Sequence, residues 1–176
     1  MTERRLDARR NHERVLSAAE EAFAEHGLAA TVPGIAERAG VGKATVYRNY
    51  PAKEDLVSAI ADRWFAELEK QLPGSTQDPV RALHEAVVGL FAALARNRLL
   101  ADLLAEGSAS SSARLLDLLG KRVAAARDAG QLRTDASVTD VRVLLCGAVL
   151  QLIRLDVRDE AAWRRYGELV LNALRA

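Results

Sequence analysis

The sequence predicts an all-α protein of about nine helices, and three observations support this class. Hydrophobic residues make up 49% of the chain and aromatic residues only 5%, with a bias to the strong helix formers Ala and Leu. Apolar residues recur at helical spacing along nearly the whole chain, whereas no alternating run of β-branched residues and no Asn-Gly turn indicates a strand. A chain of 176 residues can also bury a large core without a metal or a disulfide.

Capping and breaking residues divide the chain into elements. Thr31 can cap the second helix, with Pro33 tolerated in its first turn, and Gly27 and Pro51 interrupt the helical pattern. Asp78, followed by Pro79, marks the start of the fifth helix. Loops are expected at Pro73–Thr76 and Gly107–Ser112. We expect helices at about 10–26, 32–39, 43–49, 53–71, from 79 past Leu94, 97–106, 112–129, from 137 or 139 to 155, and 159–174.

The net charge of +1 hides a strong local asymmetry. Residues 1–16 carry +2, residues 17–37 carry −4, and residues 38–53 carry +4 without a single acid. A globally basic protein that coats nucleic acid is therefore excluded. The dense basic block at 38–53 instead indicates a local surface that faces phosphate groups.

The sequence lacks the signatures of several other classes of protein. Cys146 is the single cysteine, so no internal disulfide can form, and the polar start shows no leader; both features predict a cytoplasmic protein. The longest apolar run, Val143–Leu150, is far short of the roughly 20 residues that span a membrane. His12, His26 and His84 have no ligand-spaced partners, and no nucleophile or phosphate-loop motif is complete. We therefore expect no enzyme activity, metal, cofactor or membrane partner.

A helix-turn-helix is the motif that carries function. Two short helices flank the turn Gly40–Gly42, and the basic block lies on the second. Small residues before the turn let the helices approach closely, while polar side chains on the second helix can bond base edges and phosphates in a major groove. The alternative is an ordinary helical hairpin with a solvated run of charge.

The resemblance to a known family is carried by residues 35–56, which read IAERAGVGKATVYRNYPAKEDL. This stretch resembles the DNA-binding signature of the tetracycline-repressor (TetR) family of regulators, and the similarity extends over roughly residues 10–60. The resemblance implies that Lys43, Ala44 and Thr45 lie near bases and that the Tyr47 hydroxyl binds a phosphate. It further implies that Lys53 holds a phosphate beside the start of the fourth helix, and that Tyr50 packs. The full set of expected DNA-binding residues is Thr31, Lys43, Ala44, Thr45, Tyr47, Arg48, Asn49 and Lys53.

Three positions depart from the family pattern. Asn49 stands where the family commonly has His, and Asn can read adenine through two hydrogen bonds. Gly34 replaces a frequent capping-box acid, so the second helix is expected to be looser, and Gly42 replaces a frequent Ser, so the third helix lacks a side-chain cap. None of these changes disrupts the motif.

The resemblance implies two domains, with residues 1–52 binding DNA and residues 53–176 binding a ligand and a second copy of the chain; residues 53–72 connect them. The eighth helix is apolar nearly all round and needs two partners, which independently favours a homodimer. Interface residues are expected at Val141, Leu145, Val149, Leu152, Trp163, Tyr166, Leu169, Val170 and Ala173. Candidates for an effector pocket, which would suit an apolar or aromatic small molecule, are Trp64, Phe65, His84, Phe91, Leu103, Leu119 and Gln151.

The sequence thus predicts a regulator, in the family's commoner mode a repressor, that binds a palindromic double-stranded DNA operator as a homodimer and is released by an effector. Two alternatives stay open. The larger domain could bind a partner protein and no small molecule, or the chain could be a helical ligand carrier or enzyme.

Overall fold

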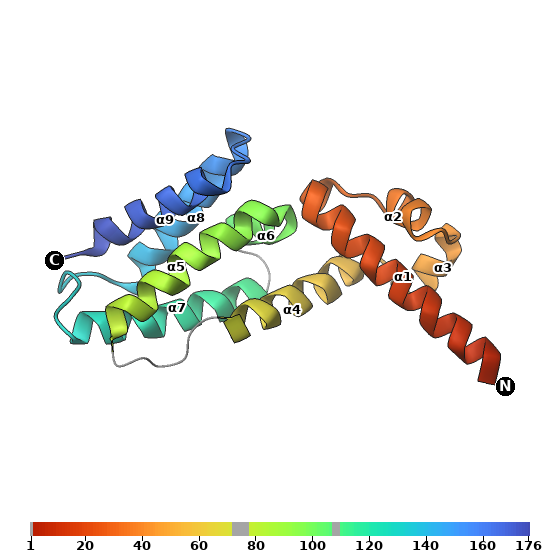
Figure 1. Ribbon diagram of the computed structural model, residues 1–176, viewed down its shortest axis with the longest axis horizontal. Helices are drawn as coiled ribbons and strands as arrows, with labels where there is room; N and C mark the ends of the chain where they lie inside the picture. The colour runs from red at the N-terminus through yellow and green to blue at the C-terminus, as the bar shows by residue number, and fades with distance from the viewer. Residues whose placement is uncertain (1, 72–77, 107–109) are drawn as a thin grey trace.

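The computed structural model describes residues 2–71, 78–106 and 110–176, and its long elements are all α-helices (Figure 1). Within these ranges the one pairing of extended backbone is an isolated bridge between Leu132 and Arg175. The predicted all-α class is confirmed. The elements are α1 (Thr2–His26), the 3-10 turn η1 (Gly27–Ala29), α2 (Val32–Ala39), α3 (Lys43–Asn49), α4 (Lys53–Gln71), α5 (Pro79–Arg96), α6 (Arg98–Glu106), α7 (Ser110–Asp128), α8 (Val138–Arg154) and α9 (Glu160–Leu174).

Side-chain caps fix where several helices begin. The Thr31 hydroxyl accepts a hydrogen bond from the Gly34 amide at 3.3 Å, and the Asp78 carboxylate accepts from two amides in the first turn of α5. Ser137 and Asp140 form a reciprocal capping box at the start of α8. The caps predicted at Thr31 and Asp78 are confirmed, and Ser137 rather than Thr139 opens α8.

Two helix starts differ from the expectation. α1 begins at Thr2 instead of near residue 10, because this stretch is rich in helix formers and Arg9 donates to Glu13 one turn further on at 3.2 Å. α7 begins at Ser110, so the last part of the loop predicted at Gly107–Ser112 is helical; Ser is well tolerated in a first turn. The rest of that loop and the one predicted at Pro73–Thr76 lie outside the described residues.

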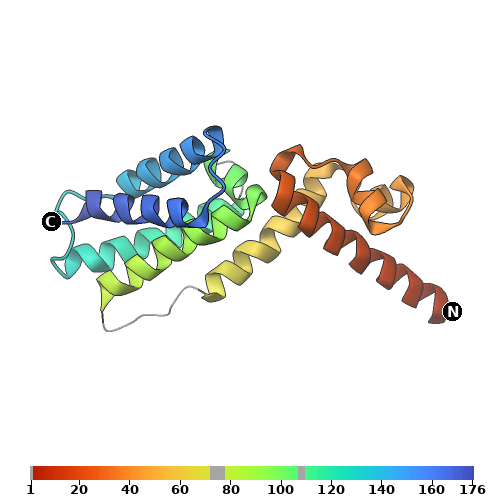
Figure 2. The same cartoon turned by 45° about the horizontal axis from the view of Figure 1, so that its top comes forward.

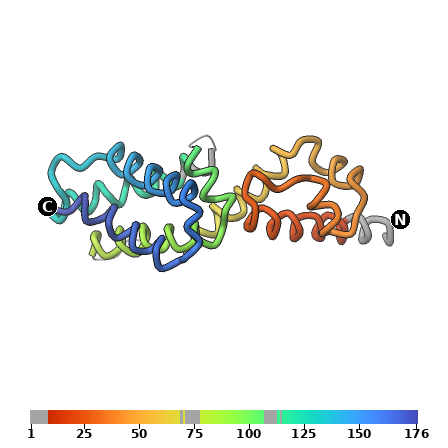
Figure 3. The backbone as a smooth tube through the Cα atoms, turned by 90° about the horizontal axis from the view of Figure 1, so that it is seen from above, coloured from red at the N-terminus to blue at the C-terminus, as the bar shows by residue number. Residues whose placement is uncertain are grey.

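The helices form two lobes (Figures 1 and 3). α1, α2 and α3 make the N-terminal lobe, while α5, α7, α8 and α9 make most of the larger C-terminal lobe. α4 runs from one lobe to the other, as Figure 2 also shows, and α6 packs against the end of α1 and η1. Among the described residues, the main contacts of the N-terminal lobe with the rest of the chain are therefore made by α4 and α6.

Each lobe has an apolar centre. Phe23, Ile35 and Val46 are fully buried and join the three helices of the N-terminal lobe. In the larger lobe Phe91 lies 6.3 Å from Trp163 between ring centroids, and α5 can approach α9 closely because Gly167 faces the Phe91 ring. None of the described helices combines the length and apolar character needed to cross a bilayer.

Candidate nucleic-acid interface

The turn between α2 and α3 is built around Gly40. This residue has φ +63°, a left-handed conformation that favours glycine, and the Val41 and Gly40 amides donate to the carbonyls of Ala36 and Glu37, both at 3.0 Å. This is the Schellman arrangement, which ends a helix and satisfies its last carbonyls. A Cβ at position 40 would also lie 2.6 Å from the Arg14 guanidinium, so this flexible side chain would have to move, and the left-handed backbone is what selects glycine here.

α3 presents a polar face to solvent. Its anchor is Val46, which is fully buried, whereas Lys43, Ala44, Tyr47, Arg48 and Asn49 are exposed. Thr45 is half-buried. As the sequence predicted, Gly42 provides no side-chain cap for this helix. α3 can therefore be held by one apolar side chain while the remainder of its surface stays free for a partner.

Two of the exposed side chains fold back along their own helix. Arg48 donates to the Ala44 carbonyl at 3.1 Å and to the Thr45 hydroxyl at 3.2 Å, and the Asn49 amide donates to the Thr45 carbonyl at 2.9 Å. Across the described part of the chain, no carboxylate forms an ion pair with Lys43 or Arg48. The positive charge of α3 is consequently not neutralised within the molecule, as a surface for phosphate requires.

The other basic residue of the motif, Arg38 on α2, forms an ion pair with α1 inside the N-terminal lobe. Its guanidinium donates to both carboxylate oxygens of Glu25 on α1, at 3.2 and 2.8 Å, and lies 3.7 Å from Glu21. This paired arrangement also lowers the pKa of Glu25 below its ordinary value, mainly through the hydrogen bond from Arg38. Arg38 thus joins α2 to α1 rather than contributing free charge.

Titration of Glu25 tests the ion pair between Arg38 and Glu25. Because its pKa is lowered in the folded chain, the pair stabilises the fold above the ordinary carboxyl pKa, and this contribution is lost as pH falls through the folded pKa. NMR of the carboxyl carbon should show a low titration midpoint that returns to the usual range in Arg38→Met. The control Arg164→Met, on α9, should leave the midpoint of Glu25 in place. An unchanged titration midpoint of Glu25 in Arg38→Met would contradict a role for Arg38 in lowering this pKa.

The residues at the edges of the motif have structural partners. Thr31 uses its hydroxyl as the cap of α2, and the Lys53 ammonium donates to the Leu28 carbonyl, which leaves this lysine half-buried. Tyr50 is half-buried and stacks on His12 with ring centroids 5.8 Å apart, so its expected packing role is confirmed. Burial also raises the pKa of the Tyr50 hydroxyl.

Comparison with known proteins agrees with this geometry. The sequence profile of the bacterial regulatory proteins of the tetR family matches residues 15–60, which include α2 and α3. A TetR transcriptional regulator from Streptomyces coelicolor is 31% identical, over 93% of this chain and 97% of that one, with a TM-score of 0.57. The chain belongs to the TetR family. It is a transcriptional regulator of this family, and α2 and α3 are its DNA-binding helix-turn-helix.

Two further TetR-like structures cover both lobes. A TetR transcription regulatory protein from Mycobacterium vanbaalenii is 30% identical over 98% of this chain and 99% of that one, with a TM-score of 0.55. The transcriptional regulator FadR from Bacillus subtilis, in complex with stearoyl-CoA, is 19% identical over 94% and 98% with a TM-score of 0.67 and shows the shared fold. A comparison with curated protein sequences gave no match.

The expected pocket residues of this TetR chain occupy three different settings. Phe65, Phe91, Leu103 and Leu119 are buried in the core, and Trp64 is half-buried. His84 bonds Glu168 of α9 at 2.7 Å near the surface, and Gln151 is exposed. None of the clefts described among the placed residues is lined by any of these seven side chains.

The expected dimer residues divide in a similar way. Val141, Leu145, Val149, Leu152, Trp163 and Val170 are buried in the chain's own core, Tyr166 is half-buried, and Leu169 and Ala173 are exposed. The buried six face inward because they form the stripes that pack α8 and α9 onto the other helices. The exposed apolar side chains Val143, Leu144 and Ala173 instead lie around a cleft of about 350 Å³, which the charged residues Arg133, Asp135 and Asp140 also line. We name Val143, Leu144, Leu169 and Ala173 the α8–α9 face.

Several contacts around the helix-turn-helix were not predicted from the sequence. These are the pairs Arg38–Glu25 and Arg63–Glu20, the latter 3.0 Å apart, and the Arg14 bond to the Gly40 carbonyl at 3.5 Å. The acidic stretch 17–37 indicated that carboxylates were present to pair with nearby cations, but it did not indicate which cations they would bind.

Proposed function

We propose that this TetR-family chain is a repressor that binds a palindromic operator as a homodimer and is released by a small apolar or aromatic effector. The observation that carries the DNA-binding part is the exposed face of α3, which holds Lys43, Tyr47 and Arg48 with no internal carboxylate partner. An α-helix with such a face fits a major groove, where cations meet phosphates and polar side chains meet base edges. A protein with this partner works in the cytoplasm, where bacterial DNA lies.

The proposed DNA contacts remain those expected from the family motif. Lys43, Ala44 and Thr45 begin α3 and would meet bases, Tyr47 would bind a phosphate, and Arg48 and Asn49 would leave their intrahelical bonds to reach the groove. Thr31 and Lys53 would contribute at the rim, where the Lys53 ammonium has further N–H donors beyond the one held by Leu28.

The α8–α9 face supports the homodimer. Val143 is 64% exposed and Leu169 is 46% exposed, and the α8–α9 face groups these with two further exposed apolar side chains. Such a face is stabilised when it packs on a copy of itself around a two-fold axis. A two-fold dimer would present two α3 helices to half-sites one helical turn apart, about 34–36 Å.

The effector site would lie among α4 to α8, within the domain proposed at 53–176 and behind the DNA-binding domain proposed at 1–52. Phe65, Leu103 and Leu119 are fully packed here, so an effector would select a conformation in which these side chains have separated. The complex of the FadR relative with stearoyl-CoA supports a ligand with a large apolar part.

Selection of duplex DNA from a random pool by the purified chain tests the proposal. We expect enrichment of an inverted repeat whose affinity falls steeply with salt, because several phosphates are neutralised on binding. Absence of enrichment together with a flat salt dependence would overturn the proposal and would favour a partner protein as the target.

Substitutions on α3 should separate base reading from phosphate binding. Lys43→Ala should weaken binding to the selected operator by about 1–3 kcal/mol and relax preference at one base pair, whereas Tyr47→Phe should weaken all sequences evenly. Fluorescence anisotropy against single-base operator variants measures both effects. Lys121→Ala, which removes an exposed lysine from α7, is the matched control. Equal losses for Lys43→Ala and Lys121→Ala would refute these roles.

A further inference from the structure

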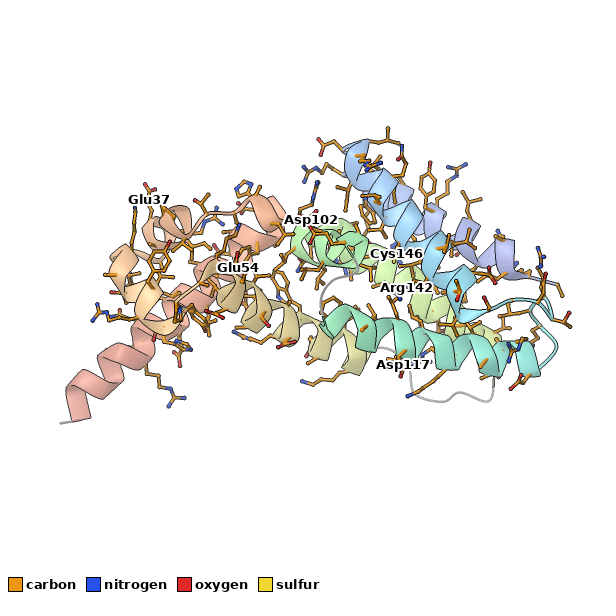
Figure 4. The ribbon with its side chains drawn as sticks, turned by 180° about the vertical axis from the view of Figure 1, so that it is seen from behind. Glu37, Glu54, Asp102, Asp117, Arg142 and Cys146 are labelled. Atoms are coloured by element: carbon orange, nitrogen blue, oxygen red, sulfur yellow. The ribbon has the colours of Figure 1, made fainter. Side chains whose placement is uncertain are left out.

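The N-terminal lobe meets α6 at one polar contact that the helix-turn-helix motif does not require. The Asp102 carboxylate of α6 accepts a hydrogen bond from the Leu28 amide of η1 at 3.0 Å. The two residues lie 74 positions apart in sequence, and the contact is partly buried. Figure 4 shows Asp102 at the junction of the two lobes.

The backbone is shaped for this contact. Gly27 has φ +54°, and a Cβ placed there would lie 2.0 Å from Asp102 Oδ2 and 2.6 Å from Arg98 Cγ. Only a residue without a side chain allows α6 to approach η1 so closely.

Leu28 is held from its other side as well. Its carbonyl accepts a hydrogen bond from the ammonium of Lys53, the first residue of α4. α3 ends only a few residues earlier, at Asn49. One residue of η1 therefore links α6 to the start of α4, beside the helix that we propose reads DNA.

Asp102 is itself fixed in place. Arg98 donates to its second oxygen at 2.9 Å, and the side chains of this pair are only 25% and 17% exposed. The Arg98 guanidinium also lies 4.0 Å from Asp156 in the turn between α8 and α9, which Arg158 binds at 2.6 Å. The chain of contacts thus extends from the α8–α9 turn to the start of α4.

We propose that Asp102 is a positioning residue for operator binding: through Leu28 it fixes how the N-terminal lobe is oriented on the larger lobe. The inference rests on the proposed function, since orientation matters when two α3 helices of a dimer must meet two half-sites at a set spacing. A fixed orientation avoids the entropy that would otherwise be lost when both lobes are ordered on DNA. It gives no advantage on a single half-site.

Asp102→Asn is the informative variant. Asn has nearly the same size, but one of the two oxygens that accept separately from Leu28 and Arg98 becomes an NH2 group, which can only donate, so the two bonds cannot both be kept in place. We expect about a tenfold loss of affinity for the full operator, as for one lost charge-assisted bond, and a change under about twofold on a single half-site. Arg98→Met, which leaves the Leu28 bond but frees Asp102, should give a smaller loss of the same kind. Asp117→Asn, an exposed acid of α7 that Figure 4 shows away from the junction, is the matched control.

Amide hydrogen exchange at Leu28 gives a readout that needs no DNA. Exchange there should become about tenfold faster in Asp102→Asn and stay unchanged in Asp117→Asn. Equal losses on full and half-sites would mean that Asp102 merely supports folding of the lobe, and they would overturn the inference, as would an unchanged full-site affinity. If the unaltered chain did not prefer full sites to half-sites, the proposed dimeric operator binding would fail, whereas the Leu28 exchange would still decide whether Asp102 holds this residue.

Discussion

Gly27→Ala is expected to lower the free energy of unfolding by about 2–5 kcal/mol. A left-handed conformation costs a residue with a Cβ about 1–2 kcal/mol, and overfilling a packed site costs about 1–3 kcal/mol more. Here the new Cβ would meet Asp102 Oδ2 at 2.0 Å and Arg98 Cγ at 2.6 Å. Either Asp102 rotates away and loses its bond to Leu28, or α6 moves off η1.

Urea denaturation measures this effect, and two variants identify its cause. Gly89→Ala on α5, where a Cβ would meet nothing within 4 Å, should stabilise the chain by up to about 1 kcal/mol. Asp102→Ala removes the obstructing oxygen. The variant that combines Gly27→Ala with Asp102→Ala should therefore lose about 1 kcal/mol less free energy of unfolding than the sum of the two single losses. Strict additivity, or a loss below about 1 kcal/mol for Gly27→Ala, would show that the close approach is not what selects glycine.

Replacing Val143 and Leu169 together with Glu is expected to raise the dissociation constant of the dimer by at least about a hundredfold. Burial of each large apolar side chain contributes about 1.5–3 kcal/mol, and each change occurs twice in a two-fold interface. The substituted carboxylates would also have to be buried or kept apart. Both side chains are exposed in the single chain, so the separated chain should keep its helical circular dichroism.

Sedimentation equilibrium measures the dissociation constant of the dimer directly. Ala125→Glu, which adds one carboxylate to an exposed position of α7, should leave association intact. If the variant with Glu at both positions still formed dimers over the same concentration range as the unaltered chain, the α8–α9 face would not be the interface. Loss of the dimer together with loss of helical circular dichroism at low temperature would instead show that these side chains support the fold.

The helix-turn-helix could be predicted almost completely because local signals specify it. Thr31 caps α2, the left-handed Gly40 ends it, and Pro51 follows α3, so the bounds of both helices agree with the expectation. These signals act over a few residues and need no knowledge of the rest of the chain. The positive charge of α3 could be inferred for the same reason, since the stretch 38–53 contains no acid.

Contacts between distant elements could not be predicted. α8 is apolar on nearly every side, so its composition did not tell that Val141 and Leu145 face the core while Val143 faces solvent. Arg38 was indistinguishable from a free cation until Glu25 was seen opposite it. The bond between Asp102 and Leu28 depends on the packing of α6 against η1, for which no local pattern exists.

Titration of the chain with two forms of the selected operator tests the central claim most directly. One duplex carries the natural spacing, and the other carries about five extra base pairs between the half-sites, which turns one of them to the opposite side of the DNA. We expect two chains per natural operator, and an affinity on the lengthened duplex that falls to the level of a single half-site. Equal affinity for both duplexes, or one chain per operator, would contradict recognition of a palindrome by a dimer.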